Sequence, residues 1–397
     1  MRRAGSPPIS IYLKIAFLFA TAKVEAMQNT PTLLEAQWPI ISRLLPPDLD
    51  RSAREYGAMK RRRGAIQNAE QLLRVMLMHI AGGLSLEQTV ARAKVRGLAS
   101  LNAMALHKRL CTSFGWLQGL TAHLIDGVKP YLQQDPALWR TGRTIRILDA
   151  TDIQEPGSTG TDWRIHYSVR LPSLCCDFFE LTDGHGAESL KRLPVLEGDI
   201  VLVDRGYNDR RAVGALVAAG ADVILRFNSS AFPLLDAEGQ PFEPIDWLRP
   251  LAVGDVAQRE VQFTCGKRGK LLQARLCAIR KTAAQARDAQ IKARRKAQKN
   301  GVQIRAQTLD YAEFIIVLTT LEESEMPVRT VLEFYRSRWQ VELAFKRLKT
   351  LLQIGTVPKT KAESSQAWMQ GKILTALLIE RMLCEARFFS PWGYPLR

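Results

Sequence analysis

The sequence predicts an α/β protein whose mixed sheet is flanked by helices, preceded by an all-helical N-terminal domain and interrupted by a β-rich insertion. Three observations lead to this fold class. Helical hydrophobic spacing dominates residues 31–132. Strand-like apolar runs and short helical segments then alternate up to residue 227. A long amphipathic run covers residues 328–352 and contains neither Gly nor Pro.

The composition is that of a globular protein with a polyanionic partner. The chain has 397 residues, enough for two or three domains, and is 46% hydrophobic. Its net charge of +17 predicts attraction to nucleic acid first and to an anionic membrane surface second. The six cysteines show neither Cys-x-x-Cys nor zinc-ligand spacing, so reduced thiols in a cytosol are expected.

Residues 1–27 imitate a secretory leader. They have a basic start, an apolar middle and a Val-Glu-Ala end, but Lys14 leaves only residues 15–22 as an apolar run. Met27 offers a more ordinary start, so this leader is expected to be a mis-set start or disordered. No other stretch approaches the roughly 18 apolar residues of a membrane span, and no membrane partner is expected.

Residues 28–135 are expected to form a helical DNA-binding domain. Amphipathic spacing marks two of its helices, residues 33–44 and 69–80. After a Gly-Gly break, Ser85 and Gln88 have the spacing of a capping box, and Ser100 is a plausible cap for the next helix. Helices separated by glycine turns fit either a helix-turn-helix DNA reader or a plain helical bundle.

Two strand-like runs of the same form each end in an aspartate. Residues 144–148 lead to Asp149, and residues 200–203 lead to Asp204, which follows Asp149 by 55 residues. An open α/β sheet presents its ligands at the carboxyl ends of its strands. Taken singly, an aspartate after a strand is more often a turn or cap residue. Three nearby acids remain alternatives to Asp149: Asp152, Asp162 and Asp177.

Further elements are expected around these two runs. The strands are an exposed one at 164–169 and others at 178–181 and 223–227; the helices are 187–193 and 209–219.

Residues 228–326 are expected to be a β-rich insertion, because the 138 residues from Asp204 to Glu342 are too many for one helix and one strand. Its strand-like runs are 261–264, 271–279 and 314–319. Residues 280–299 carry eight basic residues against one acid. They form either a basic helix that follows a phosphate backbone or a solvated helix.

Residues 328–352 read as one long helix with a polar stripe. At about 100° per residue, four polar side chains share an arc of about 60°: Tyr335, Arg338, Glu342 and Lys349. An apolar face adjoins them and is expected to meet the core: Phe334, Val341, Phe345, Leu348 and Leu352. The plain alternative is an ordinary Glu342–Lys346 pair on a solvated face.

Two strand-end aspartates and a helical glutamate suit the cleavage or joining of phosphodiesters. In-line displacement uses two divalent cations about 3.5 to 4 Å apart, which three convergent carboxylates can hold. Hard oxygen ligands favour Mg²⁺ or Mn²⁺.

The spacing Y-x2-R-x3-E-x6-K, within YRSRWQVELAFKRLK, resembles the signature of the DDE transposases of bacterial insertion sequences, in the branch with this Tyr-Arg-Glu-Lys pattern. LDATDI around Asp149 and VLVDRGY around Asp204 resemble that family's first and second acidic motifs, in the same order. Ala150 stands where the family more often has Gly or Ser. The resemblance covers roughly residues 30 to 390.

The resemblance implies a ribonuclease-H-like catalytic core formed by residues 136–227 and 327–360. It implies that Asp149, Asp204 and Glu342 are catalytic and bind two Mg²⁺ or Mn²⁺ ions per active site. It further implies that three residues hold phosphates of DNA: Tyr335, Arg338 and Lys349.

The implied protein is a DNA transposase in the bacterial cytoplasm, associated with the nucleoid. Its partners are double-stranded DNA, as terminal inverted repeats and as target, and a second copy of itself in a synaptic homodimer. It would cut the element's ends and join their 3′-hydroxyl groups to target DNA. The alternatives are a ribonuclease-H-like nuclease without strand transfer and a decayed or co-opted copy that only binds DNA.

Residues 361–397 are expected to be a C-terminal helical segment, with a mostly apolar helix over 367–389. The last eight residues offer no helix cap and no settled end. This predicts either a longer natural reading frame or a truncated copy.

Overall fold

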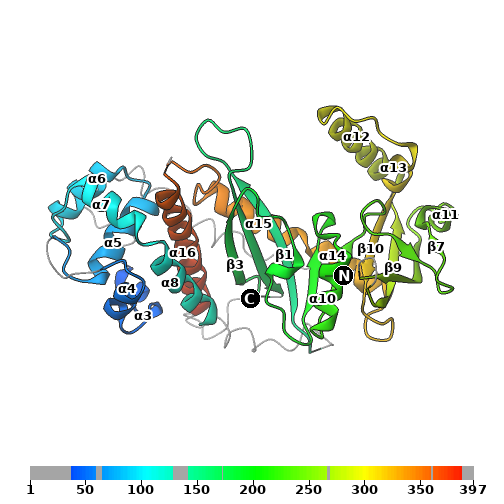
Figure 1. Cartoon of the computed structure of the whole chain (residues 1–397), viewed down its shortest axis with the longest axis horizontal. Helices are drawn as coiled ribbons and strands as arrows, with labels where there is room; N and C mark the ends of the chain where they lie inside the picture. Colours follow the sequence, from blue (N-terminus) through cyan, green and yellow to red (C-terminus); the bar gives the residue numbers. More distant parts are fainter. Residues whose placement is uncertain are drawn as a thin grey trace, which may run out of the picture.

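The computed structural model describes residues 37–59, 65–127, 142–171, 173–265, 269–358 and 361–386. The predicted leader and the last eight residues lie outside the described residues. A helical bundle lies at one end of the molecule, and a mixed sheet with helices on both faces forms the remainder (Figure 1). The predicted fold class is confirmed.

The N-terminal bundle begins with α3 (Trp38–Leu44), α4 (Leu49–Glu55), α5 (Ala69–Ile80), α6 (Leu86–Val95), α7 (Ala103–Cys111) and α8 (Phe114–Asp126). The predicted capping box is confirmed, since Ser85 Oγ accepts from Gln88 N at 3.1 Å and Gln88 Oε1 accepts from Ser85 N at 3.0 Å. Ser100 as the cap of α7 is wrong. Asn102 caps it instead, because its extended backbone lets Oδ1 accept from Ala105 N at 2.8 Å.

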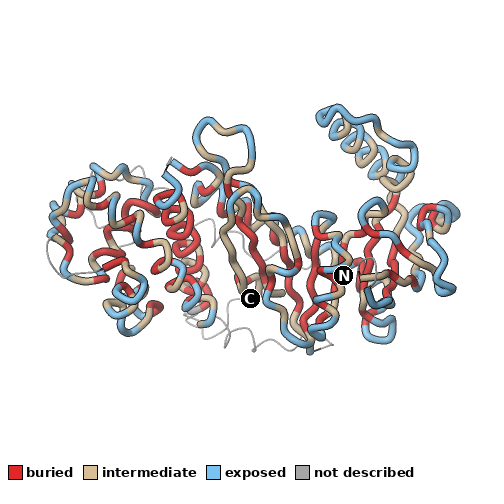
Figure 2. Tube along the Cα trace, viewed as in Figure 1, coloured by how far each residue is buried: buried red, intermediate tan, exposed pale blue. Residues whose placement is uncertain are grey.

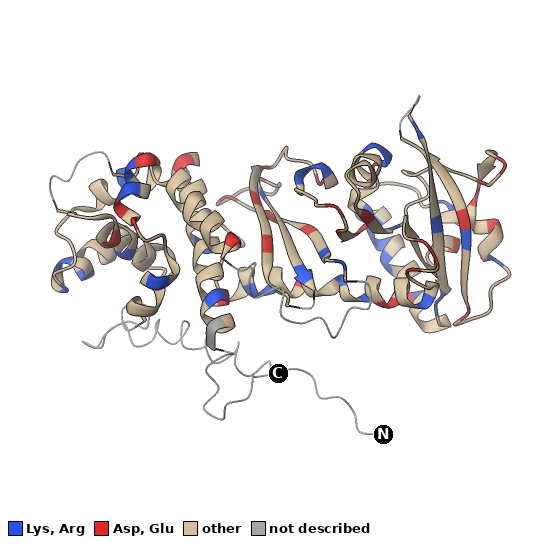
Figure 3. Ribbon diagram, turned by 90° about the horizontal axis from the view of Figure 1, so that it is seen from below, with Lys and Arg blue, Asp and Glu red and all other residues tan. Residues whose placement is uncertain are grey.

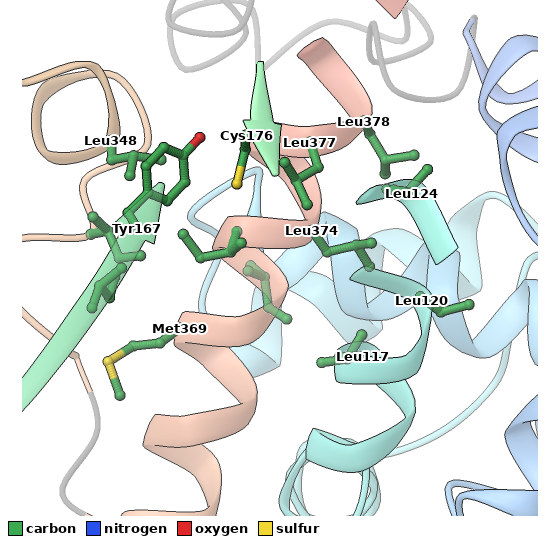
Figure 4. Close-up of a cluster of buried hydrophobic side chains, with 14 of the residues drawn as sticks. Leu117, Leu120, Leu124, Tyr167, Cys176, Leu348, Met369, Leu374, Leu377 and Leu378 are labelled. Atoms are coloured by element: carbon green, nitrogen blue, oxygen red, sulfur yellow. The ribbon is translucent and has the colours of Figure 1, made fainter. Parts of the chain in front are cut away.

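The C-terminal helix α16 (Ala362–Ala386) joins this bundle to the sheet and begins five residues before the predicted start. Figure 4 shows its apolar side chains between α8 and the edge of the sheet. The labelled residues are Leu374, Leu377 and Leu378 beside Leu117, Leu120 and Leu124, with Met369 near Tyr167. Gln370 Nε2 also donates to Thr121 Oγ1 at 2.8 Å. The bundle is therefore completed by the far end of the chain.

The described strands form one ten-stranded sheet in the order β3-β2-β1-β4-β5-β10-β9-β8-β6-β7. They are β1 (Ile145–Ile153), β2 (Trp163–Leu171), β3 (Cys176–Asp183), β4 (Ile200–Val203), β5 (Asp222–Arg226), β6 (Leu234–Leu235), β7 (Pro241–Phe242), β8 (Val256–Thr264), β9 (Leu271–Arg280) and β10 (Phe314–Thr319). The first three strands are antiparallel, whereas β4 and β5 run parallel to β1. This five-strand arrangement is ribonuclease-H-like.

Three local predictions in this sheet need correction. The strand predicted to end before Asp149 continues to Ile153, because β2 pairs with β1 along its whole length. β2 is mostly buried rather than exposed, since it lies between β1 and β3 under α15. The helix predicted over 187–193 is reduced to the 3-10 turn η2 (Leu190–Arg192), because Pro194 favours an extended Leu193.

The strands of the predicted insertion extend the same sheet. Helix α10 (Arg210–Ala218) connects β4 to β5. Within the predicted insertion, α11 (Pro244–Leu248) lies between β7 and β8, and α12 (Ala283–Lys299) and α13 (Ala306–Tyr311) lie between β9 and β10. β10 pairs with β5 on one side and with β9 on the other. Helices α12 and α13 project from this end of the sheet (Figure 1), and Figure 2 shows how little of them is buried.

The predicted single helix over 328–352 is instead two consecutive helices, α14 (Val328–Ser337) and α15 (Trp339–Thr350). The change occurs at Arg338, whose N–H donates to Tyr335 O at 3.1 Å with three-residue spacing. Ser337 Oγ also donates to Phe334 O at 2.6 Å, a contact that bends helices. The predicted apolar face is confirmed: Val341, Phe345 and Leu348 are buried, and Phe334 and Leu352 pack beside them.

Hydrophobic clusters cover both faces of the sheet. In β4, Ile200 and Leu202 join the cluster that includes the bundle and α15, whereas Val201 and Val203 join the cluster beneath α10. Basic and acidic residues are interspersed over helices and strands (Figure 3). Within the described segments, no helix combines the length and apolar character needed to cross a bilayer.

Candidate active site

The sheet register brings Asp149 and Asp204 together. The parallel ladder between β1 and β4 pairs Ile145 with Ile200 and Ile147 with Leu202, an offset of 55 residues. The same number of residues separates the two aspartates, so they occupy equivalent positions on neighbouring strands. The ladder ends just before them, which leaves their backbones free to turn apart. Asp149 lies in mid-strand and Asp204 directly follows its strand.

Each aspartate is held by a nearby backbone donor. Asp149 Oδ1 accepts from Ala150 N at 2.8 Å, and Asp204 Oδ1 accepts from Gly206 N at 2.7 Å, which caps the turn η3 (Arg205–Tyr207). Burial, together with the charge of Asp204, raises the pKa of Asp149 to about 7. The Ala150 hydrogen bond and Arg338 oppose this change. The two carboxylates therefore repel each other at neutral pH.

Glu342 reaches the same region from the first turn of α15. One turn later, the Phe345 ring packs edge-on against Tyr167 of β2, with ring centroids 6.0 Å apart. Tyr167 is the cross-strand partner of Asp149, so this contact fixes α15 over the aspartates. The Glu342 side chain is 57% exposed.

Arg338 bridges two of the predicted catalytic acids. Its Nη1 lies 3.2 Å from Asp149 Oδ2, and its Nη2 forms an ion pair with Glu342 Oε1. Two of the three predicted acids, Asp149 and Glu342, are thus connected through a guanidinium group rather than by direct approach. Among the residues that the structure describes, no three His, Cys, Asp or Glu side chains converge closely enough to hold a metal ion.

The donor set nevertheless fits a divalent cation. Asp149 and Asp204 supply the oxygen atoms that Mg²⁺ and Mn²⁺ prefer. Burial and the charge of Asp204 raise the pKa of Asp149, and a bound cation would compensate both effects. In the described arrangement Arg338 supplies the compensating positive charge.

A basic group lies beside the acids. Tyr335 on α14 is close to Arg226 and Arg338; burial raises the pKa of Tyr335, while these two guanidinium groups lower it. Arg226 ends β5, and its Nη2 donates to Phe314 O at 3.1 Å. Burial lowers the pKa of Arg226 to about 10, with a further contribution from Arg205. Arg226 was not predicted from the sequence, although a basic residue at the end of the next strand was a usable signal.

Lys349 does not join the group. It lies exposed in the last turn of α15, and its stem is directed toward Gly355. Its amino group makes no hydrogen bond or ion pair with a described residue. The structure thus brings together Tyr335, Arg338 and Glu342 of the predicted stripe.

The three alternatives to Asp149 are engaged elsewhere. Asp152 pairs with Arg164 at 2.9 Å, and Asp162 accepts from Glu155 N at 2.9 Å. Asp177 is 6% exposed and pairs with two arginines, one of them Arg146 at 2.7 Å. Of these acids, Asp149 is the one whose charge interacts with Asp204.

Glu188 and Tyr207 also lie beside the acids, and neither was predicted from the sequence. Glu188 follows β3 and lies over Gly206, where a Cβ atom would come within 2.1 Å of Glu188 Oε2. Tyr207 is 1% exposed, and its hydroxyl has no hydrogen-bond partner among the described residues. Tyr207 stands in the quoted motif VLVDRGY, but no periodic pattern pointed to Glu188.

A ribonuclease-H-like sheet with two aspartates on neighbouring strands and a glutamate on the covering helix is the arrangement expected of a DDE transposase. A family model described as "Transposase DDE domain" matches residues 182–379, a span that contains Asp204 and Glu342 and begins after Asp149. The chain is 33% identical over 350 residues to the putative transposase InsL for insertion sequence element IS186A of Escherichia coli K12, covering 87% of this chain and 93% of that protein.

The transposase for insertion sequence element IS421 of Escherichia coli is 32% identical over 351 residues, with the same coverage of 87% and 93%. A shorter match, 30% identical over 70 residues, joins 18% of the chain to 15% of the transposase for IS1151 of Clostridium perfringens. The chain therefore belongs to the DDE transposase family of insertion sequences.

We expect the metal-free protein to lose stability as the pH rises from about 4 to about 7. The pKa of Asp149 is raised from 3.8 to about 7. The folded chain therefore keeps a proton that the unfolded chain has released, and this contribution to stability disappears as the pH approaches 7. Asp149→Asn should reduce the slope and give a protein more stable than the wild type at pH 8, with little difference near pH 4 or below.

Thermal unfolding in the presence of a chelator, at several pH values, measures both slopes. Glu188, whose pKa is also raised by burial, stays in the variant and leaves a smaller residual slope. If stability depended on pH in the same way in both proteins, the pKa of Asp149 would not be the cause of the pH dependence.

Proposed function

We propose that this protein is a DNA transposase that binds the ends of its insertion sequence, cleaves them and joins the freed 3′-hydroxyl groups to target DNA. The observation that carries the proposal is the register that sets Asp149 beside Asp204, with Glu342 held over them by α15. Membership of the DDE transposase family agrees with it. A synaptic homodimer in the bacterial cytoplasm, associated with the nucleoid, is part of the proposal.

In this proposal Asp149, Asp204 and Glu342 hold two Mg²⁺ or Mn²⁺ ions. Such ions, when bound, activate the attacking oxygen and stabilise the charge that develops on the phosphate. Arg338 has the planar donor fork that binds either a carboxylate or a phosphate. It can therefore exchange its carboxylate partners for the DNA backbone when the substrate arrives.

Tyr335 and Lys349 are proposed to hold neighbouring phosphates, together with Arg338. Tyr335 lies within the basic group near Arg226, where an anionic backbone would relieve the repulsion among the guanidinium groups. Lys349 is free to reach a phosphate because no described residue pairs with its amino group. Residues 28–135 are proposed as the DNA-binding domain, and residues 136–227 with 327–360 as the catalytic core.

The test is an assay of cleavage and joining on a DNA fragment that carries both ends of the element. We expect end cuts and joined products with Mg²⁺ or Mn²⁺, and neither with a chelator. Metal-dependent cuts without joined products would favour a nuclease. Binding without any cut would indicate a copy that only binds DNA.

The projecting helix α12 is expected to contact the DNA backbone. None of its residues is buried, so the helix contributes no side chain to the core. Its six basic residues are Arg287, Lys292, Arg294, Arg295, Lys296 and Lys299. Lys281 lies between α12 and the active site in its electrostatic contacts. Burial, and then the charges of Arg226 and Arg205 near the acids and of Lys292 on α12, lower the pKa of Lys281 to about 8. A line of positive charge thus leads from Arg338 toward α12.

Replacing Arg294, Arg295 and Lys296 together by Gln should weaken DNA binding and its salt dependence. Each lost phosphate contact reduces the slope of log affinity against log salt by about 0.9, so a slope shallower by about two to three is expected. Fluorescence anisotropy at several salt concentrations measures it. The control exchanges Lys and Arg at the same three positions and should keep the slope. An unchanged slope in the Gln variant would mean that α12 is merely solvated.

A further inference from the structure

The acidic centre contains a fourth carboxylate. A Cβ atom on Gly206 would lie 2.1 Å from Glu188 Oε2 and 3.1 Å from Asp204 Oδ1, so both oxygen atoms approach the same point above this glycine. Glu188 reaches that point from the segment between β3 and β4, whereas the three predicted acids lie in β1, directly after β4 and in α15. The absence of a side chain at residue 206 makes the approach possible.

Electrostatics places Glu188 in the same group. Burial and then the charge of Asp204 raise the pKa of Glu188. Glu188 and Asp204 both contribute to the raised pKa of Asp149. Arg164 opposes the shift of Glu188, but its Nε is paired with Asp152 at 2.9 Å. Glu188 thus lies close to the carboxylates of Asp149 and Asp204, and the nearby cation, Arg164, already pairs with Asp152.

A second, independent observation points to a ligand at this place. The hydroxyl of Tyr207 is buried, with 1% of the residue exposed, and has no hydrogen-bond partner among the described residues. Three acids, Asp149, Glu188 and Asp204, and the opposing charge of Arg164 act on this hydroxyl. Buried polar groups without partners are rare and often mark the place of a water or an ion. A buried donor without a partner, close to three carboxylates, fits an ion with its bound water.

We propose that Glu188 is a fourth acidic ligand of the divalent-cation site, shared with Asp204, and that the Tyr207 hydroxyl donates to a water bound to that ion. The inference rests on the proposed function, because it assigns a further residue to the same site. Glu342 on α15 pairs with Arg338 one turn away, whereas Glu188 lies beside Asp204. Glu188 therefore supplies a carboxylate from within the sheet domain, where the described arrangement keeps Glu342 paired with Arg338.

The experiment measures Mn²⁺ binding to the purified full chain without DNA, from the loss of the free-ion electron paramagnetic resonance signal. Glu188→Gln should weaken the affinity by about tenfold or more, as expected for loss of a group that ligates or orients the metal. Glu188→Asp keeps the charge but shortens the side chain, and it should also weaken binding. Glu180→Gln is the matched control, because Glu180 pairs with Arg192 at 3.0 Å and should bind Mn²⁺ like the wild type.

The outcomes separate this inference from the proposed function. If Glu188→Gln or Glu188→Asp binds Mn²⁺ within twofold of the wild type while Asp204→Asn loses binding, Glu188 is not a ligand and the transposase proposal is unaffected. If the wild type binds no Mn²⁺, both proposals are overturned. Thermal midpoints of the variants should stay near that of the wild type, which excludes unfolding as the cause of lost binding.

Discussion

Replacing Glu342 by Gln is expected to lower end cleavage and joining by about a thousandfold or more, which corresponds to about 4 kcal/mol of transition-state stabilisation. Gln keeps the size of the side chain but removes the negative charge that a divalent cation requires. DNA binding should change little, because Glu342 repels phosphates rather than attracting them. The loss should therefore appear in the rate of the chemical step.

The measurement is single-turnover cleavage of a fragment that carries both ends, with a mobility-shift assay on the same protein. Glu333→Gln on α14 is the matched control, because Glu333 is exposed and makes no described contact with the acidic centre. It should cleave like the wild type. A Glu342→Gln variant that cleaves within tenfold of the wild type would remove Glu342 from its proposed role.

Replacing Arg146 by Met is expected to lower the free energy of unfolding by about 3 to 5 kcal/mol. Arg146 is part of β1, three residues before Asp149, and its side chain is 4% exposed. Its Nε lies 2.7 Å from Asp177 Oδ2, and its Nη1 lies 3.0 Å from Asp199 Oδ2. Both acids are almost fully buried. The substitution removes the arginine that pairs with Asp199 and leaves Asp177 with Arg170 alone.

Urea unfolding followed by circular dichroism measures this loss. Arg249→Met is the matched control, because Arg249 also pairs with two acids, Asp246 and Asp310, but on the surface. It should change the free energy of unfolding by less than about 1 kcal/mol. Adding Asp199→Asn to Arg146→Met should recover part of the loss. Equal effects of the two arginine substitutions would contradict the argument from burial.

Local patterns in the sequence were sufficient for many elements. The helix over 69–80, the capping box at Ser85 and the strand over 200–203 were predicted with their observed bounds. Each depends on contacts between residues a few positions apart, which the periodicity and the caps record directly. The domain boundaries and the roles of the site residues stay predictions.

The tertiary structure decided how these elements meet. The sequence placed Asp149 at a strand end, but β2 extends that strand to Ile153. The sequence assigned residues 314–319 to an insertion, but they pair with β5 in the common sheet. The break at Arg338 was not visible in a helical pattern without Gly or Pro, because it accompanies a side-chain bond from Ser337.

The sequence by itself therefore determined the family resemblance, the two aspartates and the helix that carries Glu342, since these are encoded in short runs. Only the tertiary structure decided that Arg338 stands between Asp149 and Glu342 and that Glu188 approaches Asp204. The physical reason is that charges buried at one point come from strands and helices far apart in sequence. Their separations depend on sheet register and packing, which no local pattern specifies.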